Sequence, residues 1–186
     1  DWLNKMQMSN WGASSSGNYR DYRNRDEAEA RARELVRRGN DTAITHGLQN
    51  RLQFGYRRDD LLAYQKMVTE VCHAHGLHVV DHLDITQFWA SAYPFAFQHT
   101  DWLQQNIRTG TPQKYFCMNK PGYIDFLAAY LAASVEVGID GFSLDEATFM
   151  NDNYCGCGTC RRKFHDETGY VLSVDNLKLA LFSDTE

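Results

Sequence analysis

The sequence lacks several features that would place it in common classes of protein. Its 186 residues contain no apolar run approaching the ~20 residues of a membrane-spanning helix. No secretory signal follows Asp1. A Gly-x-Gly-x-x-Gly fingerprint and a P-loop are both missing, which disfavours a nucleotide-binding fold. With 19 Lys and Arg against 24 Asp and Glu, the net charge of −5 gives no reason to expect nucleic acid or an anionic membrane as a partner.

The composition that is present predicts one globular domain spanning residues 1–186. Hydrophobic residues make up 43% of the chain and aromatic residues 13%, which excludes disordered and fibrous classes. A chain of this length can bury one proper core. Because the chain starts at Asp1 rather than Met, we expect a processed product or a piece of a longer protein.

A short strand, a loop and an amphipathic helix recur about four times along the sequence. The expected strands are 5–9, 42–45, 77–80 and 139–144, and the expected helices are 26–38, 59–75, 122–137 and 161–168. Strands that alternate with helices form βαβ units around a parallel sheet. A complete (β/α)8 barrel needs about 250 residues. The sequence therefore predicts an α/β fold made of parallel (β/α) units, the N-terminal half of a (β/α)8 TIM barrel.

Polar side chains end every predicted strand, which is where parallel sheets bind their ligands. They include His46 after the second strand, Asp81 and His82 on the third, and Asp145 with Glu146 on the fourth. A histidine beside carboxylates can bind a hydroxyl group, hold a metal ion or move a proton. The alternative is a hydrogen-bonded structural histidine.

The pair Asp145-Glu146 is the leading catalytic candidate. Adjacent strand residues point to opposite faces, so these two carboxylates cannot act together as a general acid and a nucleophile or base. One of them can be the acid, and its partner must come from elsewhere in the fold. Gly141, Ser143 and Asp145 form a small-residue face that fits a barrel interior, which would aim Asp145 at the barrel mouth. Glu146 points inward only if the strand bends or bulges at its end. The alternative role for either residue is to cap the turn that follows.

Three cysteines lie within six residues, in Cys155-Gly156-Cys157-Gly158-Thr159-Cys160. A tetrahedral thiolate site for Zn²⁺ needs one more ligand, and Cys117 is the candidate. Five cysteines also permit two disulfides and one leftover thiol. Pairing among three such close cysteines would be strained, so metal is favoured. Cys72 lies on the core-facing stripe of a helix and is expected to be an inert buried thiol.

Aromatic residues crowd the long segment 86–121, which is expected to be functional or to contain short helices. Most of these rings are expected to form a satellite core. Trp89 and Trp11 each follow a predicted strand end and are favoured as exposed stacking platforms.

The stretch Tyr115–Tyr123, then a helix, then Ser143-Leu144-Asp145-Glu146 and then Cys155-x-Cys157-x-x-Cys160-Arg161-x-x-Phe164 resembles family 42 glycoside hydrolases. These are β-galactosidases with a (β/α)8 barrel. The resemblance implies a structural zinc on Cys117, Cys155, Cys157 and Cys160, and Glu146 as the general acid. The family has Asn where this chain has Asp145. The sequence of residues 79–84, at the end of the third strand, also resembles hypothetical glycosyl hydrolase families with related barrels.

The resemblance implies a retaining glycoside hydrolase with Glu146 as acid/base. Its expected sugar contacts are Asp145, Asp81, His82, His46, Trp11 and Trp89. The nucleophile of such barrels follows the seventh strand, so this chain alone is expected to be inactive and to associate with the other half-barrel or with a second copy. The alternatives are a non-catalytic carbohydrate-binding or scaffold barrel, and a metal-dependent hydrolase using His46, Asp81 and His82.

Overall fold

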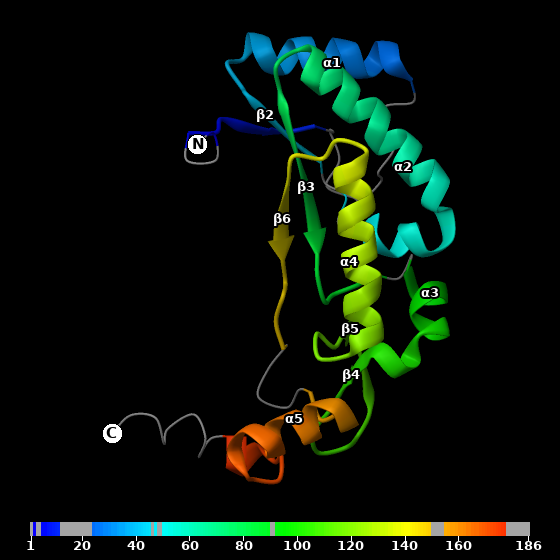
Figure 1. Cartoon of the computed structure of the whole chain (residues 1–186), viewed down its shortest axis with the longest axis vertical. Helices are drawn as coiled ribbons and strands as arrows, with labels where there is room; N and C mark the ends of the chain where they lie inside the picture. The colour runs from blue at the N-terminus through cyan, green and yellow to red at the C-terminus, as the bar shows by residue number, and fades with distance from the viewer. Residues whose placement is uncertain are drawn as a thin grey trace. The chain divides into compact units, whose positions relative to one another are not determined.

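The computed structural model describes residues 2, 5–11, 24–45, 47, 50–89, 92–149 and 155–177. The chain divides into two compact units. Unit 1 comprises residues 1–84 and 127–145, and unit 2 comprises residues 85–126 and 146–186. Figure 1 labels helices α1–α5 and strands β2–β6.

Unit 1 contains a parallel sheet of four strands in the order β1-β2-β3-β6. These are β1 (Met8–Asn10), β2 (Thr42–Thr45), β3 (His78–Asp84) and β6 (Gly141–Asp145). Along the chain, β1 is followed by helix α1 (Arg25–Arg37), β2 by α2 (Asn50–Ala74), and α4 (Pro121–Glu136) precedes β6. All neighbouring strands pair in parallel. The predicted parallel (β/α) architecture is confirmed.

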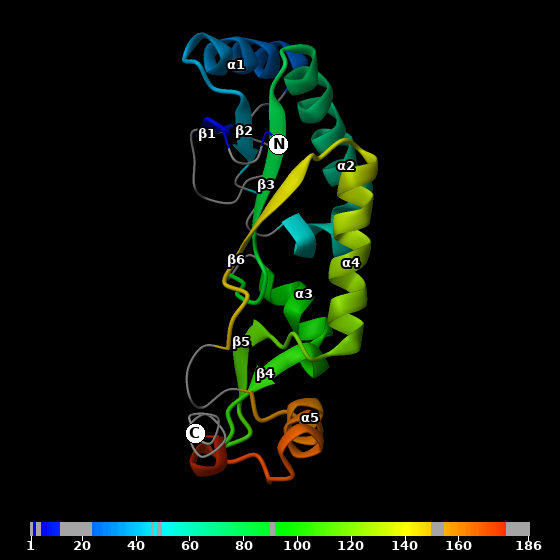
Figure 2. The ribbon, with the colours of Figure 1, turned by 60° about the vertical axis from the view of Figure 1, so that its left-hand side comes forward.

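One face of the sheet carries the core of unit 1. Ala43 and Val79 pair across β2 and β3, and both are fully buried against the apolar stripes of α1 and α2. Figure 2 shows α2 and α4 on the same side of β3. Because side chains alternate along a strand, every second residue of β3 and β6 points to the opposite face. That second face bears the polar strand ends considered below.

The helices begin and end close to the predicted positions because their terminal signals are strong. Asn24 caps α1 by accepting a hydrogen bond from the Glu27 amide at 3.0 Å. Helix α2 differs: it starts at Asn50 rather than near Asp59, and it is broken at Arg57 (φ −142°, ψ 40°). The acidic start signal at 59–60 therefore marks only its second segment. No helix among the described residues is long and apolar enough to cross a membrane.

Unit 2 gives the long aromatic segment its own structure. It contains α3 (Tyr93–Gln98), the 3₁₀ helix η3 (Thr100–Trp102) and an antiparallel hairpin of β4 (Leu103–Gln105) and β5 (Pro112–Phe116). Phe116 stacks on Tyr123, and Trp102 contacts both rings. Most of the aromatic rings thus form a satellite core, as expected. Helix α5 (Gly158–Thr168) follows, and Gly169 ends it in the left-handed conformation (φ 75°).

Candidate functional site

The ends of β3 and β6 bring four polar side chains together in unit 1. The register pairs His82 with Ser143 and Asp84 with Asp145, so these four residues share the face opposite the helices. His82 Nδ1 lies 3.0 Å from Ser143 Oγ, and His82 Nε2 lies 3.6 Å from Asp145 Oδ2. Ligand atoms of His82, Asp84 and Asp145 all lie within 4.8 Å of one another. Ser143 was not predicted as a site residue, although its small side chain on the same face was noted.

The two carboxylates of this group differ in their access to solvent. Asp84 is only 5% exposed, whereas the Asp145 side chain is 59% exposed. The His82 side chain is intermediate at 19%. The group is therefore anchored on its buried side and open on the other, as a ligand-binding site requires.

Asp81 lies on the opposite, helix-facing side of β3. It is fully buried, and its carboxylate accepts hydrogen bonds from the hydroxyls of Thr45 and Tyr130 and from Asn50 Nδ2 at 3.3 Å. This network anchors α2 and α4 to the sheet. Asp81 and His82 were expected to share one subsite, but consecutive strand residues point to opposite faces. For the same reason they do not converge on one metal ion, and His46 lies outside the described residues.

The buried carboxyl of Asp81 should make the stability of unit 1 depend on pH. Burial raises its pKa, against the opposing hydrogen bonds from Thr45, Tyr130 and Asn50. Because the folded-state pKa is raised, the fold is more stable when the Asp81 carboxyl is protonated than when it is ionised. This stabilising contribution is complete below the unfolded pKa of about 3.9. The contribution is then lost as the pH rises through the folded value, with a slope of at most about 1.4 kcal/mol per pH unit.

Asp81→Asn is therefore expected to flatten the decrease in unfolding free energy that begins above about pH 4. Urea unfolding at several pH values measures it. Asp166→Asn, an exposed change on α5, serves as the control. An unchanged slope in the Asp81 variant would show that this carboxyl ionises freely inside the fold.

The two predicted tryptophan platforms differ in exposure. Trp11 is 1% exposed and packs in the core of unit 1, because its backbone continues the pairing of β1 with β2 through a 2.8 Å bond to the Ile44 carbonyl. It offers no open ring face, which corrects the expectation for this residue. Trp89 in unit 2 is 53% exposed.

Glu146 in unit 2 has an unusual backbone conformation. Its φ of 51° is the only positive value at a non-glycine position among the described residues. Such a conformation costs about 1–3 kcal/mol and is concentrated at functional sites. It also ends the strand alternation directly after Asp145.

Neighbouring side chains of unit 2 hold Glu146 in place. The Thr86 hydroxyl donates to the Glu146 carbonyl. The Gln87 amide faces the carboxylate, and in the orientation that satisfies both groups its nitrogen donates to Oε1 at 2.9 Å. The carboxylate is thus fixed by a neutral donor. Neither Thr86 nor Gln87 was predicted, because no sequence motif marks them.

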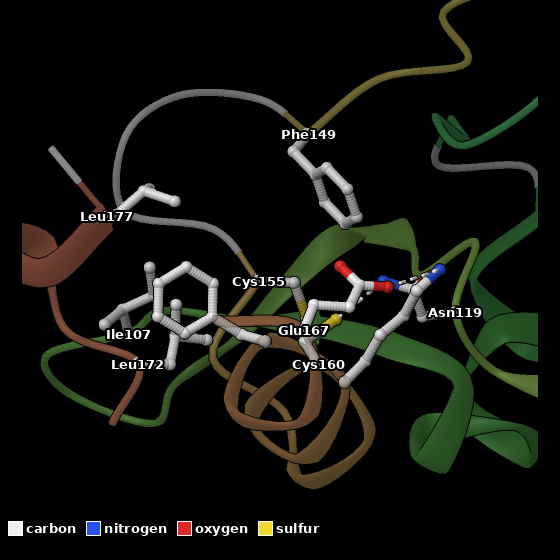
Figure 3. A pocket seen from close by; sticks show the side chains of 10 residues that line it. Ile107, Asn119, Phe149, Cys155, Cys160, Glu167, Leu172 and Leu177 are labelled. Carbon is white, nitrogen blue, oxygen red and sulfur yellow. Dashed lines mark hydrogen bonds and ion pairs between the residues drawn. The ribbon is translucent and has the colours of Figure 1, made fainter. Parts of the chain in front are cut away.

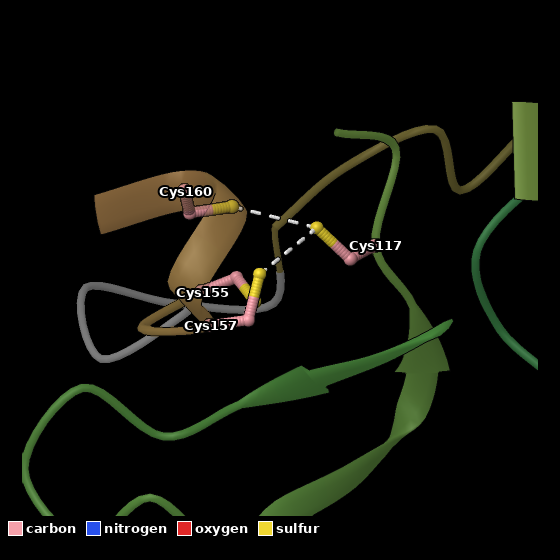
Figure 4. A group of neighbouring side chains, drawn as sticks. All are labelled: Cys117, Cys155, Cys157 and Cys160. Atoms are coloured by element: carbon pink, nitrogen blue, oxygen red, sulfur yellow. Dashed lines mark hydrogen bonds between the residues drawn. The ribbon is translucent and has the colours of Figure 1, made fainter. Parts of the chain in front are cut away.

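Four of the five cysteines form a compact cluster in unit 2, shown in Figure 4. Cys117 Sγ lies 3.4 Å from Cys160 Sγ and 3.9 Å from Cys157 Sγ. These separations exceed a disulfide bond of about 2.05 Å. They match the edges of a tetrahedron around one Zn²⁺, where sulfurs bound at ~2.3 Å lie about 3.8 Å apart. All four side chains are buried, so the residues fit a closed structural site.

Hydrogen bonds among the thiols shift their pKa values in opposite directions. Bonds to Cys155, Cys157 and Cys160 raise the pKa of Cys117, and the pKa of Cys160 is raised as well, against the lowering effect of Cys117. Donation from Cys117 lowers the pKa of Cys155 to about 7, and it also lowers the pKa of Cys157. The backbone N–H of Gln105 donates to Cys155 Sγ at 3.2 Å, and Asn119 Nδ2 donates to Cys160 Sγ at 3.3 Å. Donors of this kind orient the ligand atoms of metal sites without binding the metal themselves.

The fifth cysteine, Cys72, is fully buried in the core of unit 1. Burial raises the pKa of its thiol to about 12. The inert buried thiol expected from its helical position is confirmed.

A cavity of about 310 Å³ adjoins the cysteine cluster in unit 2 (Figure 3). Its lining is mainly apolar and comprises Ile107, Phe149, Phe164, Leu172 and Leu177. Cys155 and Cys160 line it as well, together with the polar groups of Asn119, Lys163 and Glu167. Two of the four cluster cysteines therefore line a cavity.

Solved structures of glycoside hydrolases share this fold. A noncanonic maltogenic alpha-amylase, AmyB from Thermotoga neapolitana, is 12% identical and aligns over 91% of this chain and 44% of its own, with a TM-score of 0.57. A polyextremophilic beta-galactosidase from the Antarctic haloarchaeon Halorubrum lacusprofundi is 14% identical and aligns over 88% and 25%, with a TM-score of 0.55. No family model and no curated protein matches the sequence.

The chain thus has the α/β fold of a glycosidase-like (β/α)8 barrel. Its parallel strands β1, β2, β3 and β6 correspond to half of such a barrel. It spans less than half the length of either neighbour. At these identities the likeness establishes the fold, and the residues of the site have to support the function.

Proposed function

We propose that this chain is the part of a retaining glycoside hydrolase that carries the general acid/base, Glu146. The observation that carries the proposal is the left-handed backbone of Glu146 at the end of β6, with its carboxylate held by Gln87. A strained carboxylate at the C-terminal end of a barrel strand is a typical catalytic position. The glycoside hydrolase fold of the solved neighbours supports this assignment.

The chemistry assigned to Glu146 follows from one carboxyl group changing roles. In its protonated form it gives a proton to the glycosidic oxygen as the bond to the sugar breaks. The resulting carboxylate then takes a proton from the water that releases the sugar. The Gln87 amide can donate to the carboxylate in one state and can orient the carboxylic acid in the other. The nucleophilic carboxylate is proposed to come from a later strand of the complete barrel.

In unit 1, His82 and Asp145 are proposed to contact sugar hydroxyls, and in unit 2, Trp89 is proposed to contact a sugar ring. The Asp145 carboxylate is exposed and can accept hydrogen bonds from hydroxyl groups, and His82 lies beside it. The exposed side chain of Trp89 offers an apolar surface for a sugar ring. A β-galactoside is the first substrate class to test, because the motif around Glu146 resembles that of β-galactosidases.

The cysteine cluster is proposed to bind one structural Zn²⁺. Bound zinc would link Cys117, which follows β5, to the segment that begins α5. Four thiolates fill a tetrahedral site and leave no position for water, so the ion would stabilise unit 2 without taking part in hydrolysis.

Hydrolysis and binding should be measured together on the full-length natural protein. We expect release of nitrophenol from at least one aryl β-glycoside in a panel of sugars, together with calorimetric binding of the matching free sugar. Binding without any hydrolysis would instead assign a non-catalytic carbohydrate-binding barrel. Absence of both would contradict the proposed function.

A further inference from the structure

We infer that His82, Asp84 and Asp145 form a binding site for one divalent transition-metal ion, of the class represented by Mn²⁺. The site lies at the C-terminal ends of β3 and β6 in unit 1. Its residues differ from those of the cysteine cluster. The inference rests on the geometry of unit 1 alone and does not require the proposed glycosidase activity.

The spacing of the three ligand atoms suits one ion. All lie within 4.8 Å of one another, and His82 Nε2 lies 3.6 Å from Asp145 Oδ2. This separation is too long for a hydrogen bond, whose usual range ends near 3.2 Å. Two ligands bound to one ion at about 2.1 Å in cis positions lie about 3 Å apart, and the distance grows as the angle between them widens. The pair therefore has the spacing of two ligands that share an ion.

The hydrogen bond on the other side of the imidazole favours a cation as well. His82 Nδ1 lies 3.0 Å from Ser143 Oγ. When Nδ1 carries the proton and donates to Ser143, the lone pair of Nε2 faces the Asp145 carboxylate. An ion bound by Nε2 would then also meet the Asp145 carboxylate. A partner that fixes the non-ligating nitrogen is also what metal-bound histidines use.

The positions of Asp84 and Asp145 on one face also suit a metal site. Asp84 is 5% exposed, and its register partner Asp145 places a second carboxylate on the same face. Two carboxylates on one face would balance the charge of a bound divalent ion. Asp145 remains open to solvent, so an ion held here would keep positions free for water or for other oxygen ligands.

The donor set selects the type of ion. One imidazole nitrogen and two carboxylates suit Mn²⁺ and related ions, whereas thiolates prefer softer ions such as Zn²⁺. The free positions could accept neighbouring hydroxyls of a sugar, a consequence that does rest on the proposed function. Mn²⁺ is therefore a probe that should distinguish this site from the cysteine cluster.

The test is a Mn²⁺ titration of the zinc-loaded full-length natural protein, followed by the electron paramagnetic resonance signal of free Mn²⁺. We expect one bound Mn²⁺ per chain. His82→Gln, Asp84→Asn and Asp145→Asn should each weaken binding by at least 10-fold, and Ser143→Ala by about 10-fold through loss of the orienting contact. The exposed change Asp166→Asn on α5 is the matched control and should leave binding unchanged.

Asp145→Asn keeps the test decisive if the buried Asp84→Asn variant fails to fold, because the Asp145 side chain is exposed. Absence of Mn²⁺ binding by the wild type, or equal binding by the Asp145→Asn variant, would overturn the inference. Hydrolysis is measured separately: an inactive protein that still binds Mn²⁺ would contradict only the proposed function.

Discussion

Changing Glu146 to glutamine is expected to lower aryl β-glycoside hydrolysis by the full-length natural protein by about 10²- to 10⁴-fold. Glutamine keeps the size of the side chain but cannot donate or accept the catalytic proton. The left-handed backbone at this position tolerates either side chain equally, so the fold should be retained. The measurement is kcat/KM for the substrate found in the glycoside panel.

Glu136→Gln is the matched control for this change. Glu136 is exposed at the end of α4, and its substitution makes the same chemical change away from the strand ends. Its activity should equal that of the wild type. Equal losses in both variants would show that Glu146 has no special role in the reaction.

Replacing Cys157 with serine is expected to remove one Zn²⁺ per chain and to unfold unit 2. Cys157 is fully buried, and its sulfur lies 3.9 Å from Cys117 Sγ at the centre of the cluster. Structural zinc contributes about 10–16 kcal/mol of apparent binding free energy in small zinc-dependent domains. Loss of one ligand should therefore lower the unfolding free energy by several kcal/mol, and a chelator should have the same effect on the wild type.

Metal analysis and thermal unfolding measure this second prediction. Cys72→Ala is the control, because Cys72 is equally buried but lies in unit 1, outside the cluster. It should reduce stability by a cavity effect and leave the zinc content unchanged. A zinc content that does not respond to Cys157→Ser would contradict the structural zinc site.

The fold was predictable because its local signals agree with one another. Strand β2 was expected at Thr42–Thr45 and is found there, since a short β-branched run lies between two helical patterns. Helices α1 and α4 begin and end within one residue of the expected positions. The grouping of Cys117 with the three later cysteines was also expected, and the structure brings the four sulfurs together.

The remaining features depend on contacts that a single sequence does not display. The hairpin of β4 and β5 arises inside an aromatic segment whose rings pack among themselves, so no period of two or 3.6 marks it. Trp11 was expected at an open strand end, but continued strand pairing places it in the core. The burial of a ring beside a strand end depends on which elements cover that face.

The direction of side chains at the strand ends explains the largest difference within the site. Asp81 and His82 are neighbours in sequence, yet one anchors the helices and the other meets Asp145 on the opposite face. Strand parity predicts this separation once the extent of β3 is known. The predicted strand ended at Val80, whereas β3 continues to Asp84. Directly after β6, Glu146 departs from this alternation because its backbone turns left-handed.

The most direct test of the central claim is the leaving-group dependence of hydrolysis by the wild type and the Glu146→Gln variant. A general acid matters for a leaving group that needs a proton and matters little for one that leaves as a stable anion. The account predicts a large loss for phenyl glycosides and a much smaller loss in bond cleavage for dinitrophenyl glycosides. Equal losses for both substrates would contradict the role of Glu146 as the general acid/base.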